Sequence, residues 1–94
     1  MDKSPISLGK KAYVSESLRL RIHDAILRRF IELEASEKIT PGDLARRIGC
    51  STAQVTRFLS GKRNMDLKTL AVFLFAMDAV LDVTVSTIKH DYWR

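Results

Sequence analysis

The sequence predicts an all-α fold of four to five helices, followed by one short β-strand near the C-terminus. Apolar residues recur at helical spacing, and each expected helix begins at a residue that can cap a helix N-terminus. A β-branched, alternating stretch, LDVTVST, follows the last helix. A length of 94 residues with 46% hydrophobic residues fits one domain with a single core.

The N-terminal region divides into an arm and a long helix. Residues 1–14 are mixed polar without sustained periodicity, which predicts an arm that is flexible unless bound. A helix of about five turns is expected from Ser17 to Ala35, with Ser15 or Ser17 as its N-cap. Its expected inward residues are Leu18, Ile22, Ala25, Ile26 and Leu33. A second apolar stripe is either a wider buried face or a partner surface, and it consists of Leu20, Leu27 and Ile31.

A short helix is expected to start at Thr40, where Thr40 and Asp43 form a capping-box pattern and Pro41 occupies the first helical position. Gly49 suits the left-handed residue that ends this helix. The residues expected to point inward are Leu44, Ala45 and Ile48, and those expected to point outward are Arg46 and Arg47.

A second short helix is expected from Thr52 to Ser60, preceded by another capping-box pattern at Ser51 and Gln54. At 100° per residue, its two arcs differ in chemistry. The apolar arc consists of Val55, Phe58 and Leu59, and the opposite arc of Thr52, Ala53, Thr56, Arg57 and Ser60. Two short helices joined by a tight turn that contains glycine cross steeply, as in a helix-turn-helix.

The C-terminal third is expected to hold the central core helix, because the residues that follow the cap Asp66 are apolar almost all round. A strand is expected from Leu81 or Asp82 to Ser86. A lone strand needs a partner, and a twofold copy that pairs through Val83 and Val85 is the simplest one. The expected units are therefore an arm (1–14), a helical domain (15–80) and a dimerising strand and tail (81–94).

Charge indicates the class of partner. Seven cations and two carboxylates lie between Lys38 and Lys68, whereas the rest of the chain is neutral. This asymmetry favours a polyanion, with nucleic acid ahead of a membrane surface.

No Ser-His-acid, Cys-His or paired-carboxylate spacing indicates an enzyme, and no metal or cofactor is expected. Cys50 is expected to pack in a turn and His23 to be a satisfied packing residue. Without an apolar signal segment, we expect a cytoplasmic protein.

The helix 52–60 has the size and polarity to enter the major groove of B-form DNA. Its small side chains allow close approach to base edges, and Arg57 can bond guanine through two donors. The expected base contacts are Thr52, Ala53, Thr56 and Arg57, with Gln54 either touching DNA or only capping Ser51. The expected phosphate contacts are Ser51, Lys62, Arg63 and Asn64, with Arg46 either a further contact or an ordinary solvated residue.

Residues 40–78, TPGDLARRIGCSTAQVTRFLSGKRNMDLKTLAVFLFAMD, resemble the helix-turn-helix domain of the lambda-repressor and Cro type, also called XRE-like, within a match over roughly residues 20–80. The resemblance implies a lambda-repressor-like fold, base contacts from the second short helix, and binding to operators as a dimer. Family members often hold a phosphate with glutamine where this chain has Pro41, so Thr40 or Arg46 is expected to replace that contact.

Two functions remain open at this point. The leading one is a sequence-specific regulator, a repressor that binds a palindromic operator in double-stranded DNA as a homodimer. The ending LDVTVS resembles the antitoxin subset of the family, whose strands pair across a dimer. The alternative is thus an antitoxin that neutralises a toxin protein and regulates its own operon, supported by the second stripe and by the aromatic residues Tyr92 and Trp93.

Overall fold

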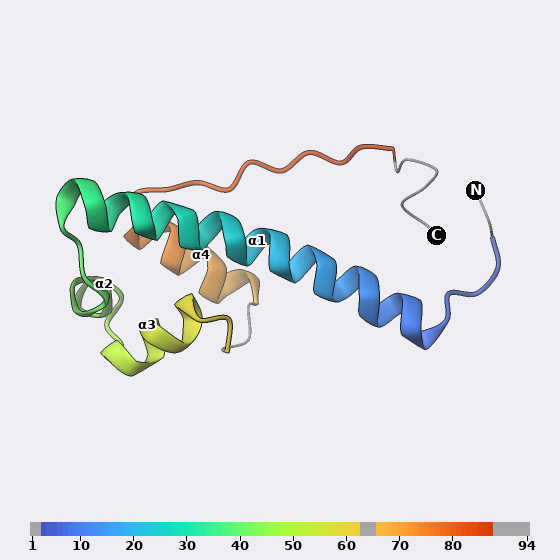
Figure 1. Cartoon of the computed structure of the whole chain (residues 1–94), viewed down its shortest axis with the longest axis horizontal. Coiled ribbons are helices and arrows are strands. Elements are labelled where there is room, and N and C mark those ends of the chain that lie inside the picture. Colours follow the sequence, from blue (N-terminus) through green and yellow to red (C-terminus); the bar gives the residue numbers. More distant parts are fainter. Residues whose placement is uncertain (1–2, 63–65, 88–94) are drawn as a thin grey trace.

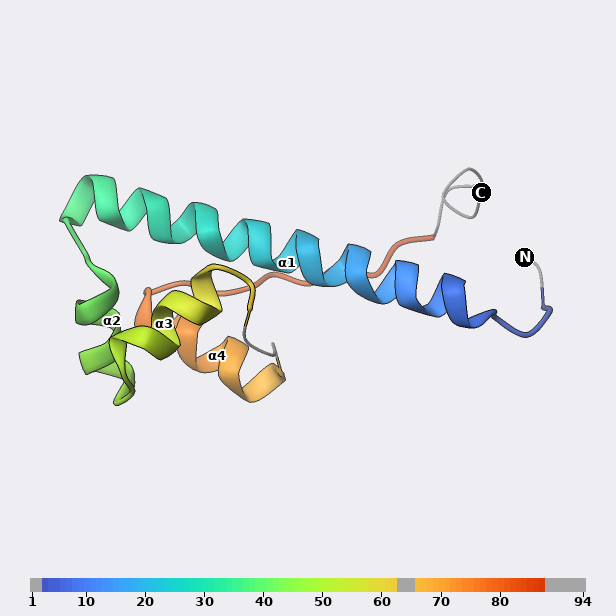
Figure 2. The ribbon, with the colours of Figure 1, turned by 60° about the horizontal axis from the view of Figure 1, so that its bottom comes forward.

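A computed structural model describes residues 3–62 and 66–87 of the chain. This part contains four α-helices and no β-strand. The helices are α1 (Leu8–Glu37), α2 (Pro41–Ile48), α3 (Thr52–Leu59) and α4 (Leu67–Ala76). The three short helices gather below the C-terminal half of α1, and the N-terminal half of α1 extends beyond them (Figures 1 and 2). The all-α fold is therefore confirmed.

One apolar core joins the four helices. The rings of Phe58 and Phe73 stack with centroids 3.8 Å apart at 15°, which fixes α3 against α4. Phe30, which was not among the expected core residues, is only 6% exposed. The buried core consists of Ile26, Phe30, Leu33, Leu44, Ala45, Val55, Phe58, Leu59, Leu70, Phe73, Ala76 and Met77.

The first helix begins earlier than expected. Ser7 is its N-cap and accepts a hydrogen bond from the Lys10 N–H at 3.1 Å, so the expected caps Ser15 and Ser17 are wrong. Residues 8–14, expected to belong to the arm, are helical, and the helix continues to Glu37. Leu18 is 53% exposed, which corrects its expected place in the core. The other helices pack against the C-terminal half of α1 only. The buried face of α1 is therefore shorter than the apolar spacing in the sequence predicts.

Helix α4 is not covered on all sides. Leu70 and Phe73 are buried, but Leu67 is 83% and Phe75 is 79% exposed. The expectation of a central helix is wrong because the bundle lies against one side of α4 only. Composition alone cannot show which apolar face is covered.

The chain beyond α4 is extended and runs back along α1 (Figures 1 and 2). Leu81 packs partly against the core. No strand is assigned to residues 81–87 in the single chain, and pairing with a second copy remains a prediction. Tyr92 and Trp93 lie outside the described residues.

Candidate nucleic-acid interface

The turn between α2 and α3 has the local structure that its sequence predicts. Gly49 adopts φ 84°, a left-handed conformation that favours glycine, and its N–H bonds to the Ala45 carbonyl at 2.8 Å. Cys50 is half-buried and packs against the core. A Cβ on Gly42 would lie 3.8 Å from the Thr52 hydroxyl, so the N-terminal ends of α2 and α3 are adjacent. A phosphate positioned at one helix start would therefore be close to the other.

Helix α3 presents the two arcs that its sequence predicts. Its apolar arc is buried, with exposures of 0% for Val55, 1% for Phe58 and 8% for Leu59. The expected base-contacting residues are all exposed, namely Thr52, Ala53, Gln54, Thr56 and Arg57. Within the described chain, the Arg57 guanidinium forms no hydrogen bond or ion pair, whereas the backbone carbonyl of Arg57 accepts from Lys62 N–H at 2.9 Å. The outward face of α3 is thus available to a ligand.

The capping box at the start of α3 is formed. The Ser51 hydroxyl accepts from Gln54 N–H at 3.1 Å, and Gln54 Oε1 accepts from Ser51 N–H at 3.0 Å. The capping role expected of Gln54 is therefore confirmed. Its side-chain NH2 group is not used in the box, so capping and a base contact through that group are compatible.

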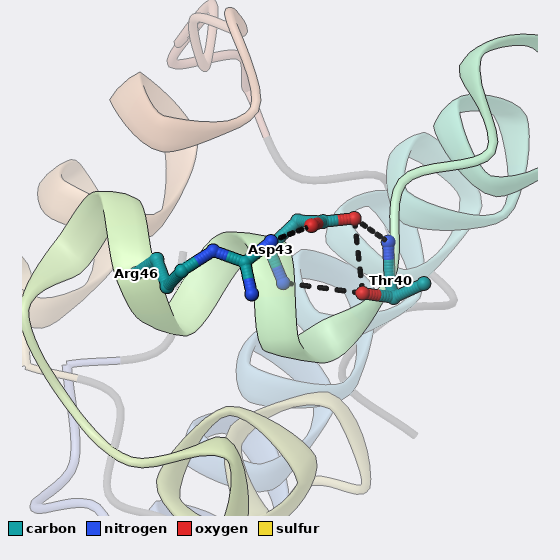
Figure 3. A network of polar contacts seen from close by, with 3 residues as sticks. All are labelled: Thr40, Asp43 and Arg46. Carbon is teal, nitrogen blue, oxygen red and sulfur yellow. Dashed lines mark hydrogen bonds and ion pairs between the residues drawn. The ribbon is translucent and has the colours of Figure 1, made fainter.

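A polar network occupies the start of α2 (Figure 3). The Thr40 hydroxyl donates to Asp43 Oδ2 at 2.9 Å and accepts from Asp43 N–H at 3.1 Å, and Arg46 pairs with Asp43 Oδ1. Bonds from Thr40 and the charge of Arg46 hold the pKa of the Asp43 carboxyl below its ordinary value. The Thr40 hydroxyl already donates its proton to Asp43, whereas the Arg46 side chain is 75% exposed. Of the two replacements for the family's glutamine, Arg46 is therefore better placed to meet a phosphate.

Two side chains of α1 hold the end of α3. His23 Nε2 lies 2.7 Å from the Leu59 carbonyl oxygen, and Arg19 Nη1 donates to the Gly61 carbonyl at 3.3 Å. Arg19 is itself held by both carboxylate oxygens of Glu16. Cationic and donor groups at a helix C-terminus satisfy its last carbonyls. The expectation that His23 is a satisfied packing residue is confirmed, and the role of Arg19 was missed because its partner is distant in sequence.

The loop after α3 places one exposed cation, Lys62, directly after Gly61, whose carbonyl Arg19 binds. Arg63 and Asn64, expected to contact phosphate, lie outside the described residues. Arg47 forms an ion pair with Asp78 at 3.5 Å, so it serves the fold as well as the charge of the surface. Six cations and two carboxylates occupy residues 38–62 and 66–68, so this region is positive in the part of the chain that the structure describes.

The expected dimerisation residues are mostly exposed. Val83 and Val85 are 77% and 95% exposed, and Leu20 and Ile31 are each 52% exposed. Leu27 is half-buried. Most of the second stripe on α1 is therefore not a wider part of the core, and its use as a partner surface stays a prediction.

Comparison with protein families decides the class. A sequence model of the Cro/C1-type HTH DNA-binding domain matches residues 29–88. The chain belongs to this family. It is a DNA-binding regulator of transcription whose helix-turn-helix is α2 and α3. No curated protein and no solved structure matches the chain. Within the described ranges, no helix is long and apolar enough to cross a membrane.

Proposed function

We propose that this Cro/C1-type protein is a sequence-specific repressor that binds a roughly palindromic operator in double-stranded DNA as a homodimer. The observation that carries the proposal is the outward face of α3, where Arg57 stands exposed among small or hydrogen-bonding side chains. Small neighbours let the helix approach the base edges, and a guanidinium fits the O6 and N7 acceptors of guanine.

The base-reading set is Thr52, Ala53, Gln54, Thr56 and Arg57, and the phosphate-binding set is Thr40, Arg46, Ser51, Lys62, Arg63 and Asn64. The first set is proposed to give sequence specificity, and the second to give affinity for any duplex. Contacts to base edges distinguish sequences, whereas contacts to phosphates position the protein on any duplex. Two recognition helices related by a twofold axis would read half-sites about 34 Å apart.

The test begins with selection of bound duplexes from a randomised pool. Affinity for the selected duplex and for a scrambled duplex is then measured by fluorescence anisotropy across a range of salt concentrations. We expect the selected duplex to bind at least about 1,000-fold more tightly, with salt-dependent affinity for both. Equal affinity for the two duplexes at every salt concentration would reject sequence-specific binding. A reporter gene behind the selected duplex gives the direction of regulation, and repression lowers its expression.

A second function is supported by the extended segment 81–87. Val83 and Val85 are 77% and 95% exposed, and an extended backbone with exposed β-branched side chains suits pairing with a strand of another protein. Such pairing would make the chain an antitoxin that captures a toxin. Co-purification with the product of an adjacent reading frame tests this role, and Val83→Pro should reduce that capture while leaving duplex binding intact.

A further inference from the structure

The N-terminal half of α1 adds little to the apolar core of the described chain. The buried residues of this helix are Ile26, Phe30 and Leu33, so residues 8–25 contribute nothing fully buried. This half projects past the other helices (Figure 1) and precedes the family match, which starts at residue 29. Its tertiary contacts in the described chain are few, chiefly the partly buried Ile22 and the bond from Arg19 to the Gly61 carbonyl. A helical stretch with so little packing is marginal in water, so this half of α1 is suited to an intermolecular contact.

An apolar line runs along the exposed side of α1. Tyr13, Leu20 and Leu27 are spaced seven residues apart, which places them nearly above one another on a helix. Tyr13 is 56% exposed, Leu20 is 52% exposed, and Leu27 is half-buried. Ile31, 52% exposed, widens the line at its C-terminal end. We call these four residues the α1 seam.

Charge along α1 is divided between its two halves. Residues 8–23 contain four cations and one carboxylate, whereas residues 24–37 contain two cations and four carboxylates. Two parallel copies would place like charges side by side. Two antiparallel copies would place the positive half of each against the negative half of the other, which lowers the electrostatic energy of the pair.

We propose that α1 pairs antiparallel with α1 of a second copy through the α1 seam, with the twofold axis near His23 and Asp24. Leu20 then packs against the partner subunit's Leu27, and the Tyr13 hydroxyl faces the partner subunit's Glu34. This inference rests on the homodimer of the proposed function and assigns its interface. This interface is separate from Val83 and Val85, because the segment after α4 starts beside Arg29, which lies about half a turn round α1 from the seam.

The same twofold axis places both recognition helices on one side of the dimer. Arg19 and His23, which hold the end of α3, lie roughly 80° round α1 from the seam at 100° per residue. The axis of an antiparallel helix pair is perpendicular to the plane that contains both helices. Both copies of α3 therefore lie on the same side of the pair.

The size of the contact predicts its strength. The paired stretch, residues 10–37, is about 40 Å long and one helix wide. A contact of this length and width is small for a stable dimer, because the typical interface buries about 800 Å² per partner. We expect dissociation in the micromolar range and stronger association when both copies bind one duplex.

The interface is tested with two matched variants of the full chain. Leu20→Lys puts a charge into the α1 seam, and Leu18→Lys puts the same charge on an equally exposed site about 160° away. Sedimentation equilibrium across the micromolar range should show at least about tenfold weaker dimerisation for Leu20→Lys and little change for Leu18→Lys. Circular dichroism checks that both variants stay helical. Equal dimerisation of the two variants, or a monomeric wild type, overturns the proposal.

The orientation has its own measurement. Spin labels on Lys11→Cys in a Cys50→Ser background should be separated by about 38 Å in the antiparallel pair and by about 10–15 Å in a parallel pair. A short distance overturns the antiparallel arrangement.

Affinity for a single half-site separates the two proposals. Leu20→Lys should bind a half-site duplex as wild type does and lose affinity only for the two-half-site duplex. A wild type that dimerises through the seam but prefers no duplex would contradict the proposed function and leave the interface standing.

Discussion

The Nε2 atom of His23, in the middle of α1, lies 2.7 Å from the carbonyl oxygen of Leu59, the last residue of α3. Arg19 repeats this arrangement one turn earlier on α1, where it donates to the Gly61 carbonyl. The end of the recognition helix is thus tied to the helix that carries the α1 seam. Such a connection lets one rigid body hold both the recognition surface and the proposed dimer surface.

Replacement of His23 should loosen the end of α3. His23→Ala removes the donor to Leu59, and the loss of one partly buried hydrogen bond is expected to lower the free energy of unfolding by about 1 kcal/mol. His23→Gln keeps a donor and should recover part of the loss. Urea unfolding gives the midpoints, with Arg21→Ala, an exposed site on the same helix, as the control. An unchanged midpoint for His23→Ala would mean that this bond contributes nothing to folding.

Two glycine substitutions should change the free energy of unfolding in opposite directions. Gly49 has φ 84° in the turn before α3, so Gly49→Ala forces a side chain into the left-handed region at a cost of roughly 1–2 kcal/mol. Gly9 lies in the first turn of α1, where a Cβ would meet nothing within 4 Å, so Gly9→Ala should stabilise the helix by less than the roughly 0.5–1 kcal/mol expected in the middle of a helix. Thermal melts compare the two variants. A destabilised Gly9→Ala would show that residue 9 is not helical in solution.

The sequence predicts the helix-turn-helix well because its signals are local. Both capping boxes, at Thr40 with Asp43 and at Ser51 with Gln54, bond residues three apart, and the structure contains both. The start of α1 was missed because Ser7 is followed by little apolar periodicity. The contacts of His23 and Arg19 with the end of α3 span 36 and 42 residues, and no local pattern records them. Residue type also cannot show that one side of α4 is uncovered.

Acid should weaken the fold through Asp43. Its pKa is lowered by bonds from the Thr40 backbone and hydroxyl and by Arg46, so its contribution is present at neutral pH. That contribution is lost as the pH falls below about 4 through the folded-state pKa. Asp43→Asn should therefore reduce the slope of the unfolding midpoint against pH in this acid range. Asp82→Asn, at an exposed carboxylate outside the α1 seam, is the control and should leave the slope close to that of wild type.

The extended segment gives a test that divides the two candidate dimer surfaces. The double variant Val83→Pro, Val85→Pro removes two backbone donors and prevents strand pairing at these positions. Because the α1 seam does not include this segment, we expect sedimentation to show an unchanged dimer and operator affinity to be retained. Conversion to a monomer would move the interface to residues 81–87.

Replacement of Arg57 and of Lys62 should separate specificity from affinity. Arg57→Ala removes the expected guanine contact, and we expect a loss of about 1–3 kcal/mol on the selected operator with relaxed preference at one base pair in each half-site. Lys62→Ala removes a phosphate contact, so the selected and scrambled duplexes should weaken alike, and the slope of log affinity against log salt should fall by about 1. Anisotropy titrations of both variants on both duplexes give the comparison. If both variants lost the same affinity on every duplex, the Arg57 guanidinium would be acting on phosphate, and another side chain of α3 would have to read the bases.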